Sequence, residues 1–507
     1  MSEIKAGAVL NYVSIAVRLV TQFLLTPYII LKLGIDEYGL FMLSHTVISW
    51  LALTDLGLGV TVNKYVVTYR AKGEHERQAH FLGQSLLLYT ALGFAGLLIG
   101  LVGFANLDVL FPALNPEQEQ VFNILYLLTL GNFVLSFPLR PINSLPGAYQ
   151  KFVVPGLVSL IASIVNASLT VLLLVWGYKS IGLTLMSVAV SITLLLWGVF
   201  YALFILKAKF KFGKPDIALY KGMFGFAVWV FLGQLMDMFY WQAGSPILAA
   251  VSGTVAVSIF SLGISFTGYF MTASTAISGV LAPRLMHMVA MDADKAALTQ
   301  VMIRAGRLQL FLLSMILLGF AFLGQDFLNL WVGDSMGNNV TTVWLGAMLV
   351  LPPLVIPLTQ NTGLPILQAL HLHKGRSLIL FYTSLLCVAL GGGLSCSFGA
   401  LGMFIGTAIS LILGQGAMMN IYYSRCAGLY VGAFFKRTYL PILQPLLFLG
   451  ACGCALSFIP VNDWGLFSLL ATVYGSLCAC VLFFWYLNRE EKDMFLIPVK
   501  KIFRRKQ

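Results

Sequence analysis

Long, nearly uncharged apolar runs constrain this chain more than any other feature. About fourteen follow one another, each long enough to cross roughly 30 Å of hydrocarbon as a helix. Of the 507 residues 59% are hydrophobic and only 10% are charged, whereas soluble domains carry about 25% charged residues. We therefore predict an all-α polytopic membrane protein. The runs lie near residues 8–31, 38–62, 81–106, 119–142, 153–176, 181–206, 222–250, 255–281, 308–330, 343–367, 377–398, 400–424, 439–459 and 464–487.

The positive charges are distributed unevenly between the two sides of these spans. All of the 31 Lys and Arg residues except Arg18, Lys32 and Lys179 lie in the N-terminal tail, the loops after even-numbered spans or the C-terminal tail. By the positive-inside rule both termini are predicted to be cytoplasmic. The net charge of +12 therefore indicates topology and contact with anionic lipid headgroups, above all at residues 207–221 and 500–506, and not nucleic-acid binding.

A weak internal repeat predicts the architecture. Pro27, Gly34 and Phe41 recur 219 residues later as Pro246, Gly253 and Phe260. A repeat of six spans enters the membrane twice from the same side, which is typical of transporters with a site between two bundles. We predict two pseudo-symmetric six-helix bundles around a central cavity, over residues 1–206 and 207–425, with an extra helix pair and basic cytoplasmic tail over 426–507.

Two prolines at matching positions predict breaks in the first and seventh spans. Pro27 and Pro246 each remove a backbone donor. Broken helices at corresponding positions of two halves point to a transport pathway. Transmembrane helices also tolerate proline routinely, so ordinary packing remains open.

Arg18 lies near the middle of the first span, where a charge costs roughly 3 kcal/mol on insertion scales. A guanidinium stays protonated, so this position predicts a water-filled cavity that accepts an anion. Other polar residues recur at helical spacing beside it or on other spans, where they line either the cavity or helix contacts. The candidate cavity residues are Asn11, Arg18, Gln22, Asp55, Arg140, Gln234, Asp237 and Trp241.

Arg18 has two candidate partners among the few intramembrane charges. The repeat offset maps it onto Asp237, which predicts opposite charges on opposite walls, released when an anionic substrate competes for Arg18. A static salt bridge, or a pair with Asp55 on the adjacent span, remains open.

The chain shows no catalytic or metal-binding pattern. Clustered carboxylates, a nucleotide-binding glycine loop and a nucleophile–base arrangement are missing from the sequence. The seven Cys have spacings that suit neither zinc nor a disulfide framework. We expect neither an enzyme nor a cofactor, and transport coupled to protons, sodium or the membrane potential.

The end of the second span carries a family signature. Residues 54–74 read TDLGLGVTVNKYVVTYRAKGE, and LGIDEYGLF at 33–41 and LQALHLHKGR at 367–376 add to it. The chain resembles the Wzx-type polysaccharide flippases of the multidrug/oligosaccharidyl-lipid/polysaccharide exporter superfamily. The matching positions are Asp55, Gly57, Gly59, Tyr65 and Arg70.

The resemblance implies a flippase that moves a lipid-diphosphate-linked oligosaccharide, such as an O-antigen unit on undecaprenyl diphosphate, to the outer leaflet of the cell inner membrane by alternating access. It implies membrane lipids, a polysaccharide polymerase and chain-length machinery as partners. In some relatives the extra helix pair forms a groove for the lipid tail. Arginine suits a diphosphate, which agrees with a cationic cavity.

Two other functions remain open at this stage. An ion-coupled multidrug exporter of the same superfamily would carry acidic cavity residues for cationic drugs, whereas the first span carries Arg18. A membrane-embedded polysaccharide polymerase would have a large outer loop, whereas the predicted outer loops are short.

Overall fold

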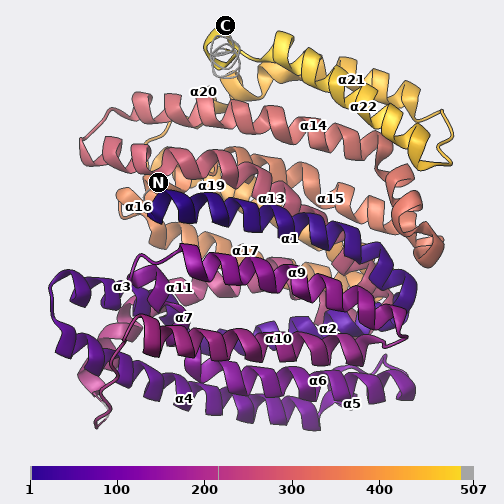
Figure 1. Cartoon of the computed structure of the whole chain (residues 1–507). Helices are drawn as coiled ribbons and strands as arrows, with labels where there is room; N and C mark the ends of the chain where they lie inside the picture. The colour runs from indigo at the N-terminus through magenta and orange to yellow at the C-terminus, as the bar shows by residue number, and fades with distance from the viewer. Residues whose placement is uncertain (1–2, 215, 493–507) are drawn as a thin grey trace, which may run out of the picture. The chain divides into compact units, whose positions relative to one another are not determined.

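The computed structural model describes residues 3–214 and 216–492, and every regular element in these ranges is a helix (Figure 1). Within them, twelve helices are long and apolar enough to cross a membrane, or up to fourteen if each of two bent pairs is one span. The predicted all-α polytopic class is confirmed. Helices suit a membrane because each one satisfies its own backbone hydrogen bonds. Their apolar side chains suit contact with hydrocarbon.

The chain forms two compact units, Met1–Ser261 and Leu262–Gln507. The main helices of the first unit are α1 (Glu3–Leu33), α2 (Ile35–Leu51), α3 (Leu58–Ala71), α4 (His75–Ala105), α6 (Pro116–Ser136), α9 (Val153–Val175), α10 (Ser180–Phe200), α11 (Ile217–Trp241) and α12 (Gly244–Val251). The main helices of the second are α14 (Lys295–Met336), α15 (Asn339–Thr359), α16 (Gly363–Ala369), α17 (His373–Phe398), α18 (Ala400–Leu411), α19 (Met419–Arg425), α20 (Val431–Thr438), α21 (Leu443–Leu456) and α22 (Trp464–Val481). Helix α13 (Gly253–Ala290) contains the boundary.

The first unit ends later in the chain than the predicted boundary at residue 206. Helix α12 packs on α2, and α11 packs on α3. The first turns of α13 are tied to the start of α2, where Thr254 donates to Asp36 at 2.6 Å and the Ser258 hydroxyl donates to the carbonyl of Ile35 at 2.5 Å. These contacts place residues 217–261 in the first unit.

Two glycines of the internal repeat have the same backbone conformation. Gly34, between α1 and α2, has φ of 80°, and Gly253, at the start of α13, has φ of 79°. Residues with a side chain rarely adopt this left-handed region of backbone conformation, so glycine is favoured at both positions. The sequence repeat therefore marks the same turn twice.

The Asp-Leu-Gly-Leu-Gly run forms a sharp bend between α2 and α3. A short helix, η1 (Ala52–Asp55), ends α2, and the two helices meet at 46°. Leu56 and Gly57 have positive φ values of 49° and 75°. A Cβ on Gly57 would lie 2.7 Å from the Ala227 carbonyl oxygen, so glycine also lets α11 approach. Helix α11 itself bends by 48° in this region.

The two prolines behave differently from each other. Helix α1 continues through Pro27 from Glu3 to Leu33, so the predicted break there is wrong. The Thr26 hydroxyl donates to the Gln22 carbonyl at 2.7 Å in this turn. The interruption between α11 and α12 falls at Gln242 and Ala243, and Pro246 sits in the first turn of α12, where proline is tolerated.

The last helices of the second unit pack on the long helix α14, beside which they run in Figure 1. A Cβ on Gly306 would lie 2.8 Å from the Phe434 ring, so this glycine brings α20 close to α14. The Tyr486 hydroxyl donates to the Thr438 carbonyl at 2.9 Å, which ties η6 (Leu482–Tyr486), the continuation of α22, to α20. The predicted extra helix pair is thus part of the second compact unit.

Candidate functional site

Helix α1 presents a polar face and an apolar face on opposite sides. Arg18 and Gln22 are both exposed and lie one turn apart. The exposed apolar residues Val20, Leu24 and Leu31 recur at helical spacing. Positions 18 and 20 are separated by about 200° around a helix, so the two exposed faces point in opposite directions. Such a helix can meet lipid with one face and water with the other.

Arg18 has no ion-pair partner among the residues that the structure describes. Arg18, Lys32 and Lys179 are the three cations outside the segments predicted to be cytoplasmic. Of these, Lys179 pairs with Glu37 at 3.3 Å, and the Lys32 amine lies 5.8 Å from the Tyr28 ring centre. Arg18 makes neither kind of contact with any side chain that the structure describes. The salt bridges to Asp237 or Asp55 are therefore not formed in this structure.

The other candidate residues occupy several environments. On α11, Asp237 is exposed and makes an interaction of its own, while Gln234 and Trp241 are half-buried. Arg140 is half-buried, with its guanidinium carbon 4.9 Å from the centre of the Phe137 ring. The side chain of Asn11, also on α1, lies outside the described residues.

Asp55 belongs to the packed interior of the first unit and does not line a cavity. Its carboxylate is 5% exposed and accepts a hydrogen bond from the Tyr89 hydroxyl at 2.5 Å. It also accepts one from the backbone N–H of Gly59 at 3.3 Å, in the first turn of α3. The sequence prediction is corrected here: a helix bend exposes backbone donors, and Asp55 satisfies one of them.

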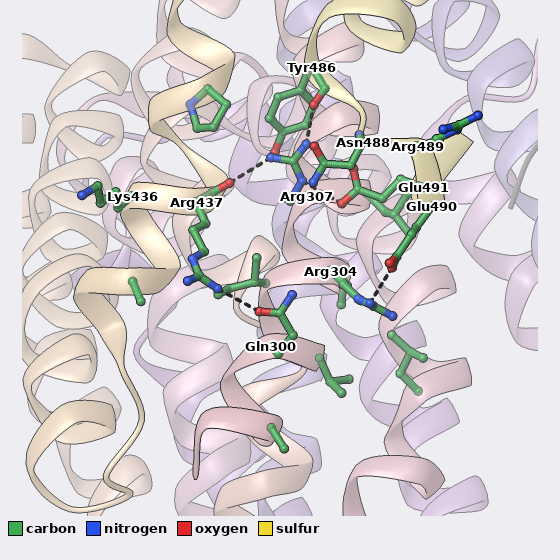
Figure 2. A pocket seen from close by; sticks show the side chains of 18 of the residues that line it. Gln300, Arg304, Arg307, Lys436, Arg437, Tyr486, Asn488, Arg489, Glu490 and Glu491 are labelled. Atoms are coloured by element: carbon green, nitrogen blue, oxygen red, sulfur yellow. Dashed lines mark hydrogen bonds and ion pairs between the residues drawn. The ribbon is translucent and has the colours of Figure 1, made fainter. Parts of the chain in front are cut away.

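A basic pocket in the second unit was missed by the sequence analysis. It encloses about 1360 Å³ between the end of α13, the start of α14, α20 and the segment that follows α22 (Figure 2). Its lining includes six cationic side chains and two carboxylates. These residues come from three separate stretches of the chain, within 281–308, 433–441 and 485–491, so no local sequence motif predicts the pocket. The one signal was the uneven distribution of charge. The charged residues are Arg284, Arg304, Arg307, Lys436, Arg437, Arg489, Glu490 and Glu491.

Arg307 lines this pocket, and each of its three guanidinium nitrogens donates a hydrogen bond. It is 4% exposed, and its Nε donates to Glu491 at 2.7 Å. Its other nitrogens donate to the carbonyls of Arg437, at 2.9 Å, and Tyr486. The guanidinium also stacks over the Tyr486 ring, 4.3 Å from its centre. A buried charge needs this many partners, so Arg307 fastens the C-terminal helices to α14.

Metal binding has no support in the described part of the chain. No group of three or more His, Cys, Asp or Glu side chains there could hold an ion. The seven cysteines are all free thiols.

Solved structures with the same fold define the class. A lipid II flippase MurJ in an inward closed conformation matches with a TM-score of 0.72 at 15% identity, over 97% of this chain and 99% of that one. An inward-facing multidrug resistance MATE family transporter of the MOP superfamily matches with a TM-score of 0.60 at 13% identity, over 83% and 95%. The chain therefore shares its fold with these two proteins, and its many long apolar helices are those of a multi-pass membrane protein.

Sequence comparisons then give the family. The family model described as "Polysaccharide biosynthesis protein" matches residues 5–289, and the chain belongs to this family. It is 22% identical over 493 residues to the uncharacterized membrane protein EpsK of Bacillus subtilis (strain 168), covering 94% of both chains. It is also 22% identical over 427 residues to the probable flippase AglR of Haloferax volcanii, covering 82% of both.

Proposed function

We propose that this transporter is a flippase that moves a lipid-diphosphate-linked oligosaccharide from the cytoplasmic to the outer leaflet of the cell inner membrane. The carrier lipid is undecaprenyl diphosphate, and the product feeds cell-surface polysaccharide assembly, for example of O-antigen. Membership of the polysaccharide biosynthesis family and the similarity to a probable flippase support this role.

The observation that carries the proposal is the exposed Arg18 on the polar face of α1, which has no partner among the side chains that the structure describes. An arginine donates two parallel hydrogen bonds to a phosphate, and each charge-assisted bond is stronger than a neutral one. Since no carboxylate of the described residues forms an ion pair with Arg18, a diphosphate need not displace a partner. Gln22, one turn further along the same face, would offer amide groups to the sugar.

The membrane potential provides a driving force for this direction of transport. With both termini cytoplasmic, the substrate carries negative charge out of an inside-negative cell. Each exported charge gains about 2.3 kcal/mol per 100 mV. Proton or sodium coupling is therefore not required, although a proton counter-flux through exposed Asp237 is compatible with the proposal.

Depletion of the protein tests the function directly. Mass spectrometry of lipid extracts should then find a specific undecaprenyl-diphosphate glycan accumulating, with no accumulation when wild-type protein is restored. A drug-resistance profile of an overexpressing strain provides the contrast with a multidrug exporter. Increased resistance to cationic drugs together with unchanged lipid-linked glycans would overturn the proposal in favour of drug export.

A polymerase and chain-length machinery would act on the flipped product.

A further inference from the structure

The basic pocket of the second unit has more positive than negative charge. Only two of its six cations have a carboxylate partner within the described residues, Arg304 with Glu490 and Arg307 with Glu491. The other four have none there, and all four are exposed. Like charges gathered in one pocket repel each other unless an anion lies between them. These four residues are Arg284, Lys436, Arg437 and Arg489.

Two arginines are placed to hold an anion together. In Figure 2, Arg437 and Arg304 lie on either side of Gln300, below the occupied Arg307. Arg437 donates to the neutral Oε1 of Gln300 at 3.1 Å. Arg304 donates to Glu490 at 2.5 Å, but this pair is open to solvent, with side chains 55% and 76% exposed. An exposed ion pair contributes little to stability, so an anion can compete with Glu490 for Arg304. It can likewise compete with the neutral Gln300 amide for Arg437.

Most of the uncharged residues that line the pocket are apolar, which favours a lipid over a soluble anion. Trp485 and Leu440 are 55% and 58% exposed, and Leu308 and Met288 line the same space. A pocket lined by both basic and apolar side chains matches a molecule with a phosphate and acyl or prenyl chains. Tryptophan is typical of the depth where headgroups meet hydrocarbon.

We propose that this pocket binds the phosphate headgroup of a membrane lipid, with Arg304 and Arg437 holding the phosphate oxygens. Trp485 and Leu440 contact the first methylene groups of the chains. The buried Arg307 keeps the C-terminal helices in place and does not take part in binding. The site lies within the second unit and does not depend on the transport function proposed for the chain. Both bulk anionic phospholipid and a polyprenyl diphosphate carry the chemistry that it recognises.

Quenching of Trp485 by brominated lipids tests this site in the full-length protein. The protein is placed in phosphatidylcholine nanodiscs that contain increasing fractions of dibromo-phosphatidylglycerol or dibromo-phosphatidylcholine. The signal of Trp485 is the difference between wild type and Trp485→Phe, because the chain has nine Trp. We expect saturable quenching by the anionic lipid at low mole fraction, and only gradual, linear quenching by phosphatidylcholine.

Charge variants then locate the binding groups. Removing one cation near the membrane surface should weaken anionic lipid binding about fivefold. The double variant Arg304→Gln/Arg437→Gln should therefore need roughly 25-fold more lipid for half-saturation. Its matched control is Arg77→Gln/Arg425→Gln, which removes the same charge from exposed positions outside the pocket and should bind as wild type does. Arg304→Lys/Arg437→Lys keeps the charge and should retain most of the binding.

Competition separates the two lipid sources. Polyprenyl diphosphate that relieves quenching at a lower mole fraction than unbrominated phosphatidylglycerol would identify the carrier lipid as the occupant. Equal competition would identify bulk phospholipid. The proposal is overturned if phosphatidylcholine quenches as strongly as phosphatidylglycerol, or if the double glutamine variant, eluting as a single peak, binds as wild type does. Inorganic pyrophosphate that displaces the lipid at equal concentration would also overturn the assignment to a lipid.

Discussion

Arg18 in the first unit and Arg307 in the second are both arginines of apolar helices, but they have opposite surroundings. Arg307 is buried and contacts a carboxylate, two carbonyls and an aromatic ring. Arg18 is exposed and has no partner of this kind among the described residues. A charge within an apolar span is costly unless water, another protein group or a ligand surrounds it. The comparison teaches that the number of partners, and not the residue type, separates a structural arginine from a candidate ligand-binding one.

The largest effect on stability is expected at Arg307. Replacing it with Gln leaves the buried Glu491 carboxylate unpaired, which should lower the free energy of unfolding by about 3–5 kcal/mol. Unfolding in mixed detergent micelles measures this change. Arg304→Gln, which breaks an exposed ion pair on the same helix, is the control and should cost about 1 kcal/mol or less. Equal losses in the two variants would contradict a special role for burial.

Gly57 should give the next largest effect. Gly57→Ala puts a Cβ at φ of 75° and 2.7 Å from the Ala227 carbonyl oxygen, so strain and overpacking should each cost about 1–3 kcal/mol. The control is Gly131→Ala, in α6, where no atom lies within 4 Å of the added methyl group. There the helix should gain roughly 0.5–1 kcal/mol. A neutral Gly57→Ala variant would show that α3 and α11 do not pack as described.

A smaller loss of stability is expected when the hydrogen bond between Tyr89 and Asp55, next to the bend between α2 and α3, is removed. Tyr89→Phe removes the donor to the buried Asp55 carboxylate, and a hydrogen bond to a charged group contributes about 1.5–3 kcal/mol. Tyr382→Phe, at a tyrosine that is 64% exposed, is the control and should change stability by about 0.5 kcal/mol or less. If both variants unfold at the same denaturant concentration as wild type, Asp55 does not hold the bend through Tyr89.

Arg18 should show the smallest effect on stability. Without an ion pair or a packed environment, Arg18→Gln should change the free energy of unfolding by about 0.5 kcal/mol or less. The same unfolding titration measures it beside Arg307→Gln. A loss as large as that of Arg307→Gln would mean that Arg18 has structural partners after all, and the contrast between the two arginines would no longer hold.

The spans and the repeat could be predicted because lipid imposes strong, local constraints. A membrane helix needs a continuous apolar run, and a left-handed turn needs glycine, so both are visible in the sequence. The bend at residues 52–58 was not predicted, although its motif was found, because Leu56 adopts φ of 49° only in the packed fold. Pro27 was predicted to break α1, yet the helix continues through it.

The surroundings of the candidate residues were predictable only in part. Arg18 stood out because one charge in an apolar run is conspicuous on its own. Asp55 is also a single charge in an apolar run, but it is a buried hydrogen-bond acceptor. That role becomes visible only from its contacts with Tyr89 and Gly59 in the structure. The basic pocket depends on α13, α14, α20 and the segment after α22 coming together. Charges at the ends of separate spans indicate topology until tertiary packing shows which ones share a space.

The central claim is that Arg18 contacts the diphosphate of the transported lipid. The most direct measurement is the rate at which purified protein in vesicles flips a fluorescent undecaprenyl-diphosphate oligosaccharide, compared for wild type, Arg18→Gln and the charge-matched control Arg77→Gln. Loss of a charged hydrogen bond worth about 1.5–3 kcal/mol should slow Arg18→Gln roughly 10- to 100-fold, with Arg77→Gln unchanged. An Arg18→Gln protein that is folded and flips the lipid at the wild-type rate would contradict the account.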